Sequence, residues 1–275
     1  MISKIDSYKN EMVKIQNPFQ QNVEQKVYND MGDVYFAFID VLGFKYMYER
    51  LQVSTQGQGD IENDPSIKFK KVFSYYFQIM NKLRFISEDA DTYAGQTSDS
   101  LYFYTKKIEF LFGFINVFTL FNQYAMSQDV FFRGGIAQGK LFMKAKHQFY
   151  GDSVIKAYLL ESVVAQNPVI YVDHKTANDI YHFSEKNGIC SKQESIIYED
   201  VNNQRYYLKP FYKPHFEDYI EYLSETIDFK PVAFADIQEI LKKNKIIFEY
   251  HPKTFCKYTF LEKELKKATE NTKTC

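Results

Sequence analysis

The chain has 275 residues, long enough for one large domain or for one domain with an appendage, and its formal net charge of −1 excludes a general attraction to nucleic acid or anionic membranes. Its cysteines, Cys190, Cys256 and Cys275, lie far apart without a CxxC pair, which argues against a disulfide framework or a zinc cluster. The first residues lack the apolar core of a signal peptide, and no apolar run is long enough to span a bilayer. We therefore expect a cytoplasmic protein that binds neither membrane nor nucleic acid.

The first third of the chain predicts an arm, a strand and a long helix. Residues 1–30 are polar, with weakly periodic apolar positions that indicate a helical arm. The near-continuous apolar run Val34–Asp40 is typical of a strand buried on both faces. A helix is expected from Phe44, and apolar residues at helical spacing predict a second helix over Ser66–Ile86.

The middle of the chain predicts a hairpin and then alternating helices and strands. Two short strands flank Ser98-Asp99-Ser100, which we interpret as a hairpin tip. The predicted elements are strands at Thr92–Thr97 and Leu101–Tyr104, a strongly apolar helix at Ile108–Met126, a strand at Val130–Ile136 that Leu141–Met143 could extend, a helix at Ser153–Ala165 and a strand at Val169–Val172.

This order, strand–helix–strand–strand–helix–strand, predicts an α+β fold with a ferredoxin-like (βαββαβ) core that carries added helices and strands. Beyond residue 173 the pattern is weaker. It predicts helices at Lys175–Phe183, Phe216–Ile227, Phe234–Lys243 and Tyr258–Lys267, and a strand at Arg205–Phe211. We divide the chain into an N-terminal helical arm (1–30), a catalytic core (31–180) and a mostly helical C-terminal extension packed on the core (181–275).

Asp40 is the first candidate for a functional residue, because a lone carboxylate at the end of an apolar strand is costly to bury unless a cation compensates it. Asp40 could instead cap the helix that follows the strand. In a ferredoxin-like sheet the hairpin tip lies beside the end of the first strand, so we expect Asp40 and Asp99 to meet. Two carboxylates on neighbouring strands suit Mg²⁺ or Mn²⁺. Two such ions about 4 Å apart can activate a hydroxyl and stabilise leaving oxygens.

Phosphate contacts are expected next to this carboxylate pair. The backbone of Val41, Leu42, Gly43 and Phe44 enters a helix, and its free N–H groups could cradle a triphosphate. Gly43 would permit close approach of that backbone, although taken alone it is better explained as an ordinary turn glycine. Arg133 could hold phosphate oxygens or the leaving pyrophosphate, or form a surface or interface ion pair.

Two further positions lie on the predicted helix after Gly151. Tyr158 and Glu161 fall at helical spacing and could read a base, contact a partner subunit or line a partly buried helix face. Asp152 is predicted to cap that helix.

Four motifs together resemble the class III nucleotide cyclases and follow that family's order over residues 34–172. FIDVLGF resembles the first metal-binding strand, SDSL the hairpin with the second metal-binding aspartate, RGGIAQG the Arg-x-Gly-Ile-x-x-Gly strand, and YGDSVIKAYLLE the glycine-then-helix segment. The resemblance implies two divalent metal ions (Mn²⁺ or Mg²⁺) held by Asp40 and Asp99, with Ile39 assigned to the same metal site.

The chain departs from adenylate-type cyclases at the residues that read the purine. Gly95 stands where those enzymes have an adenine-reading lysine, and Ile155 and Leu159 stand where they have an asparagine and an arginine. The pattern is instead similar to the Pycsar pyrimidine cyclases of bacterial antiphage defence. That similarity implies a homodimer with sites at its interface, UTP or CTP as substrate, and an effector activated by the cyclic product.

From these motifs we expect a uridylate cyclase that converts UTP to 3′,5′-cyclic UMP and pyrophosphate. Asp40, Asp99 and Arg133 would be the catalytic residues, and the base pocket would include Gly95, Thr97 and Tyr158. The alternatives are a cytidylate cyclase that makes cyclic CMP, a non-catalytic nucleotide-binding regulatory dimer on the same fold, and an enzyme related to polymerase palms or diguanylate cyclases.

Overall fold

The structure is a computed structural model that describes residues 29–42, 65–87, 91–145, 148–192, 194–212 and 232–271. The expected helices from Phe44 and at Phe216–Ile227, and residues 1–28 of the expected arm, lie outside these ranges. Among the described helices, none combines the length and the apolar character needed to cross a membrane.

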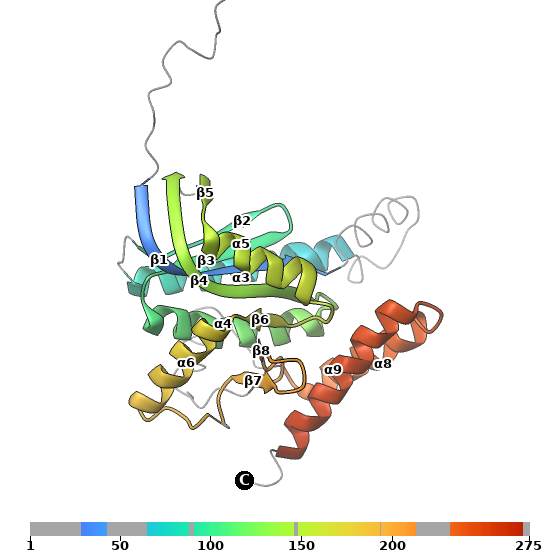
Figure 1. The fold of residues 1–275 in the computed structure, drawn as a ribbon. Helices are drawn as coiled ribbons and strands as arrows, with labels where there is room; N and C mark the ends of the chain where they lie inside the picture. Colours follow the sequence, from blue (N-terminus) through green and yellow to red (C-terminus); the bar gives the residue numbers. More distant parts are fainter. Residues whose placement is uncertain are drawn as a thin grey trace, which may run out of the picture.

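The described strands form one eight-stranded sheet in the order β2-β3-β1-β4-β6-β8-β7, with β5 paired to β4 (Figure 1). The strands are β1 (Asn29–Val41), β2 (Tyr93–Thr97), β3 (Ser100–Thr105), β4 (Phe132–Ala145), β5 (Gln148–Tyr150), β6 (Ile170–Val172), β7 (Ile197–Asp200) and β8 (Arg205–Leu208). The neighbours β2-β3-β1-β4 are all antiparallel, which is the ferredoxin-like arrangement, and β6 adds to β4 in parallel. The predicted fold class is therefore confirmed.

The helices cover both faces of this sheet. They are α3 (Pro65–Ser87), α4 (Ile108–Ser127), α5 (Asp152–Leu159), the π-helical turn η2 (Leu160–Val164), α6 (His174–Lys186), α8 (Phe234–Ile247) and α9 (Pro252–Asn271). Figure 1 shows α8 and α9 side by side as a hairpin at one side of the sheet. This hairpin packs on Met126 and Phe131 through Leu241, Leu261 and other buried residues.

The two faces of β1 explain why the sequence of this strand is apolar almost throughout. Tyr35, Ala37 and Ile39 belong to the largest core cluster, with residues of α3, α4 and α6. Phe36 lies in a second cluster on the opposite face, with residues of β3 and α5. Side chains alternate along a strand, so a strand covered on both faces needs apolar residues at successive positions.

The structure differs from the predicted elements at several places. β4 is one strand through its glycines to Ala145, and β5 and β7 were not predicted. The predicted helix Ser153–Ala165 changes from α to π geometry at Leu160. The proposed boundary after residue 180 falls inside α6, and beyond it the β7–β8 hairpin continues the same sheet, so the C-terminal part contributes strands as well as helices.

Candidate functional site

The strand register puts the candidate residues in one row across four strands. Asp40 on β1 is paired with Ser100 on β3 and with Arg133 on β4, and Ser100 is paired in turn with Thr97 at the end of β2. Asp99 occupies the turn between Thr97 and Ser100. The side chain of Asp40 points to the sheet face that carries α5, because its neighbour Ile39 is buried on the other face. In the structure, as expected, the hairpin tip lies beside the end of β1 that carries Asp40.

The carboxylate of Asp40 contacts groups from both neighbouring strands. Ser100 Oγ donates a hydrogen bond of 3.1 Å to Asp40 Oδ1, and Arg133 Nη2 lies 3.8 Å from Asp40 Oδ2. Burial raises the pKa of Asp40 and the nearby Asp99 raises it further, while the Ser100 hydrogen bond and Arg133 oppose the rise. The helix that Asp40 was alternatively expected to cap lies outside the described residues.

The two carboxylates fit a divalent cation only together with other ligands. Within the described ranges, no group of three or more histidine, cysteine, aspartate or glutamate side chains is arranged to hold a metal ion. Burial first and the nearby charge of Asp99 second raise the pKa of Asp40, and a cation between the two carboxylates would oppose both effects. Magnesium is commonly held by one or two carboxylates plus substrate phosphates, so the donor set suits it. Ile39 could contribute only its main chain, since its side chain is buried in the opposite core.

Arg133 has a second and closer anionic neighbour. Its Nε lies 2.7 Å from Oε1 of Glu161 on η2, and the Glu161 side chain is only 5% exposed. Burial raises the pKa of Glu161, Arg133 lowers it, and Asp40 and Asp99 raise it again. Arg133 is thus held between two carboxylates with its side chain 30% exposed, and its closest ion pair is with the buried Glu161.

Sequence reasoning considered Glu161 as a base reader, a partner contact or part of a buried helix face, but not as the ion-pair partner of Arg133. Its spacing from Tyr158 suggested one shared helix face, but Glu161 is buried whereas Tyr158 is half exposed. A pattern in the sequence could have indicated that Glu161 is buried. Small residues stand four and eight positions before it and four after it, and all four positions are buried: Ser153, Ala157, Glu161 and Ala165.

The expected base-pocket residues lie at different distances from this row. Thr97 is part of it, and Gly95 lies two residues further along β2, where it is paired with Tyr102. A Cβ atom on Gly95 would overlap the ring of Tyr102, so the glycine makes room for that ring. Tyr158 lies on α5, where its ring packs against the ring of Phe38 in a T-shaped arrangement with 5.8 Å between the ring centroids.

The expected phosphate cradle is only partly described. Val41 is the last residue of β1, and its side chain is buried. The N–H of Leu42 donates a 2.8 Å hydrogen bond to the carbonyl of Phe131, so the prediction that this group is free for phosphate is wrong. The strand pairing with β4 extends one residue further than the sequence indicated. Gly43 and Phe44 lie outside the described residues.

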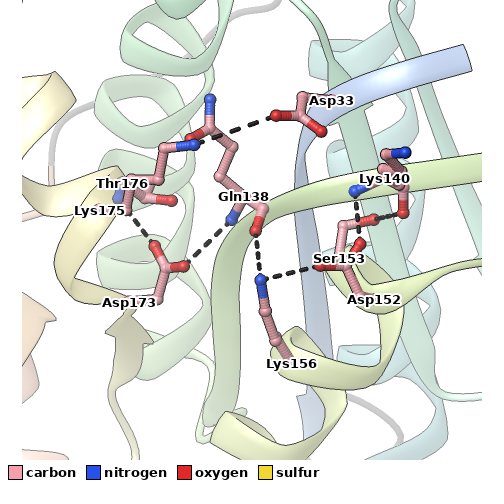
Figure 2. A network of polar contacts seen from close by, with 9 residues as sticks. All are labelled: Asp33, Gln138, Lys140, Asp152, Ser153, Lys156, Asp173, Lys175 and Thr176. Carbon is pink, nitrogen blue, oxygen red and sulfur yellow. Dashed lines mark hydrogen bonds and ion pairs between the residues drawn. The ribbon is translucent and has the colours of Figure 1, made fainter.

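The start of α5 is fastened to β4 by polar contacts (Figure 2). Lys156 Nζ donates to the carbonyl of Gln138 at 3.2 Å and pairs with Asp152 at 2.9 Å. The carboxylate of Asp152 accepts from the N–H of Lys140, and Ser153 Oγ donates to the Lys140 carbonyl. Asp152 therefore does not cap α5 as predicted. The N-cap residue is Gly151, and Asp152 ties the first turn to the neighbouring strand instead.

The same stretch of β4 is tied to α6 on its other side. The Asp173 carboxylate caps α6 by accepting from the N–H of Thr176 at 2.8 Å, and it also accepts from the N–H of Gln138 at 3.3 Å (Figure 2). These contacts hold α5 and α6 against β4, the strand that carries Arg133.

Comparison with solved structures finds guanylyl and adenylyl cyclases. A monomeric guanylyl cyclase domain of the RhoGC fusion protein from the aquatic fungus Blastocladiella emersonii is 13% identical and has a TM-score of 0.39, over 66% of this chain and 96% of that one. The catalytic core of a rhodopsin-guanylyl cyclase with converted specificity, in complex with ATPalphaS, is 14% identical with a TM-score of 0.40, over 66% and 96%. A bacterial light-regulated adenylyl cyclase is 12% identical with a TM-score of 0.44, over 87% and 67%.

No protein-family model and no curated protein sequence matches the chain. The function proposed below therefore rests on the residues of this chain.

Proposed function

We propose that the protein is a pyrimidine nucleotide cyclase that converts UTP to 3′,5′-cyclic UMP and pyrophosphate. The observation that carries this proposal is the juxtaposition of Asp40, Asp99 and Arg133 at one end of the ferredoxin-like sheet. Two carboxylates and a guanidinium on one sheet face are suited to a metal-bound triphosphate, since phosphoryl transfer depends on positioning and charge stabilisation. The motif resemblance to the class III cyclases supports the same reaction.

In the proposed reaction the ribose 3′ oxygen attacks the α-phosphorus and loses its proton, and the bond from the α-phosphorus to the bridging oxygen breaks as pyrophosphate leaves. Asp40 and Asp99 would hold the divalent ions, whose charge would stabilise the phosphate oxygens. Arg133 donates to phosphate oxygens through its Nη atoms, because its Nε side already faces Glu161. Ser100 keeps the carboxylate of Asp40 turned toward the hairpin tip.

The position of Gly95 supports a pyrimidine rather than a purine. A lysine at this position reads adenine in adenylate-type cyclases, but here the ring of Tyr102 occupies the space above Gly95. The aromatic ring therefore leaves no room for a lysine side chain from position 95. Cytidylate cyclase activity, with cyclic CMP as product, is the alternative within this class.

An exposed apolar face on α5 and η2 supports the proposed homodimer. Ile155, Tyr158, Leu159 and Val163 are all about half or more exposed and recur at helical spacing. Ile155 and Leu159 stand at the positions of the adenylate-type asparagine and arginine and can offer no hydrogen bond, so any further polar contact to substrate comes from elsewhere. A symmetric dimer is the common way to cover such a face.

The test is to incubate the purified protein with Mn²⁺ and, separately, with ATP, GTP, CTP or UTP, and to measure pyrophosphate and the mass of the nucleotide product. Cyclic UMP from UTP alone supports the proposal, and cyclic CMP from CTP alone supports the alternative. A cyclic purine nucleotide would overturn the specificity. Binding of a nucleotide without pyrophosphate release would favour a non-catalytic regulatory dimer. Asp40→Ala and Asp99→Ala should each abolish the product.

The antiphage role is part of the same proposal and needs its own measurement. We propose that the cyclic product activates an effector protein, as the resemblance to Pycsar cyclases implies. The test is phage plating efficiency on bacteria that carry the chain with its candidate effector, with Asp40→Ala as the inactive control.

A further inference from the structure

We propose that Glu161 is the positioning residue for Arg133, and that the π-helical turn η2 exists to deliver its carboxylate to the guanidinium. This inference rests on the proposed function, because it assigns to Arg133 the role of holding phosphate oxygens. It adds a residue that does not touch the substrate but decides in which direction Arg133 presents its free N–H groups.

The first step is the division of the guanidinium into two sides. Its Nε faces Glu161 Oε1 at 2.7 Å, and Nη2 points toward Asp40 Oδ2 at 3.8 Å. Fixing the Nε side leaves the Nη atoms as the donors that reach the Asp40 end of the site. A guanidinium presents its donors in a rigid planar fork, so the direction of one side determines the direction of the other.

The second step is the way in which Glu161 reaches the sheet. Four residues are buried at intervals of four positions: Ser153, Ala157, Glu161 and Ala165. An α-helix has 3.6 residues per turn, so positions four apart gradually rotate around the helix axis and away from the buried face. The N–H of Ala165 bonds instead to the carbonyl of Leu160 at 2.8 Å, an i→i+5 bond that widens the turn. Such π-turns are frequent at functional sites.

The third step is that β4 is built to accept this turn closely. A Cβ atom on Gly135 would overlap the carbonyl of Ala157 and the side chain of Leu160, so the absence of a side chain there allows the helix to lie directly on β4. Gly135 is two residues from Arg133 on the same strand face. The polar contacts of Lys156 with Gln138 and Asp152 hold the other end of the helix.

The fourth step concerns the contact itself. Arg133 Nε and Glu161 Oε1 are both buried and lie 2.7 Å apart, but among the described residues neither has a partner that satisfies hydrogen-bond geometry. The pair is therefore held by charge, and its alignment can tighten when phosphate oxygens engage the Nη atoms. Catalytic hydrogen bonds in a free enzyme are often imperfect in this way.

The experiment compares Glu161→Gln, which keeps the size and removes the charge, with Glu264→Gln as a matched control. Glu264 is also a buried glutamate paired with a basic side chain, Lys267, but it lies on α9 and has no contact with Arg133 in the described structure. We expect Glu161→Gln to lower kcat by about 10- to 100-fold with little change in KM, because a small misplacement of a positioning group has that effect. Glu264→Gln should leave kcat unchanged, and Glu161→Asp should restore part of the loss.

The proposal also requires that Glu161 act through Arg133. In an Arg133→Ala background, Glu161→Gln should reduce kcat further by less than about twofold, since residues that act as a unit are non-additive. An equal loss in both backgrounds, or a wild-type kcat for Glu161→Gln, overturns the proposal.

A second readout is the Arg133 Nε–H signal in a ¹⁵N–¹H spectrum. This signal is identified as the one that disappears in the Arg133→Lys variant, because lysine has no guanidinium Nε–H. That signal should shift in Glu161→Gln and not in Glu264→Gln.

The spectrum separates this inference from the proposed function. If the wild type makes no cyclic product but binds UTP, cyclase activity is wrong, and the positioning role is then judged by the Nε–H shift together with weaker UTP binding in Glu161→Gln. If UTP neither reacts nor binds, Arg133 has no phosphate to hold and both proposals fail. An unmoved Nε–H signal in folded Glu161→Gln protein overturns the positioning role whatever the activity.

Discussion

Asp40 on β1 and Arg133 on β4 are direct cross-strand partners, yet their closest charged atoms remain 3.8 Å apart, while Arg133 lies 2.7 Å from Glu161. The arginine therefore compensates Asp40 only partly, and the pKa of Asp40 stays raised by burial and by Asp99. An incompletely compensated carboxylate beside a fixed guanidinium is costly for the free protein but suits a site that receives a cation and a phosphate together.

The first prediction is that Asp40→Asn makes the metal-free protein more stable and at the same time inactive. The folded pKa of Asp40 lies above its unfolded value, so the charged form destabilises the fold at alkaline pH, and this cost disappears as the pH falls through the folded pKa toward 3.8. The variant should therefore unfold at higher urea concentration than the wild type at alkaline pH, with the difference vanishing in acid. Equal urea midpoints at alkaline pH would contradict this. Cyclase turnover should fall by at least about 100-fold, because a metal ligand is lost.

The second prediction concerns Gly95. Gly95→Ala should destabilise the protein by about 1–3 kcal/mol, because the added methyl group meets the ring of Tyr102 and the site is already filled. The cost should nearly disappear in a Tyr102→Ala background, where the obstructing ring is gone. Urea denaturation of the wild type, both single variants and the double variant gives the coupling energy. Additive effects would show that the ring of Tyr102 is not what excludes a side chain at position 95.

The sheet topology and the approach of Asp99 to Asp40 could be predicted because both follow from local patterns. Alternating and helical periodicities identify the strands and helices of the core, and the connection order then places the hairpin tip beside the first strand. The π-turn could not be predicted, because it depends on which carbonyl the N–H of Ala165 selects once the helix meets Gly135. The contact between Glu161 and Arg133 was missed for that reason.

The other differences have the same origin in tertiary contacts. β5 and β7 are only three and four residues long, so neither carries enough alternation to be distinguished from a loop. Asp152 has the right residue type for a cap, but the N–H of Lys140 on the adjacent strand is a competing donor. Leu42 stays hydrogen-bonded to Phe131 because the two backbone segments continue side by side for one residue beyond the paired ends of β1 and β4. None of these partners can be recognised from neighbouring residues in the sequence.

The third prediction is that Lys257→Met stabilises the protein at neutral pH. Burial lowers the pKa of Lys257 and the nearby Arg133 lowers it further, and no ion pair compensates Lys257 in the described part of the chain. A lysine whose folded pKa is lowered destabilises the fold below that pKa, and the cost is lost as the pH rises toward 10.5. Thermal melts should show a higher Tm for Lys257→Met at neutral pH and a smaller difference in alkali. Lys263→Met, at an exposed position on the same helix, is the control.

The last prediction tests the proposed dimer through the exposed apolar face of α5 and η2. Ile155→Glu and the double variant Ile155→Glu/Leu159→Glu place charges on this face without removing a buried contact, because both side chains are exposed. If the face is the dimer interface, size-exclusion chromatography with light scattering should show a dimeric wild type and a double variant of half its mass, with cyclase activity lost in parallel. Burying an unpaired charge in an interface is costly enough to prevent association.

Val201→Glu is the matched control for that experiment. Val201 is a highly exposed apolar residue in the turn between β7 and β8, away from α5, so its replacement adds the same single charge as Ile155→Glu without touching the proposed interface. The control should remain dimeric and active. A wild type that is monomeric under assay conditions and still active would show that one chain completes the site. A dimeric double variant would place the interface on another surface, and the exposed face of α5 would then need a different partner to explain it.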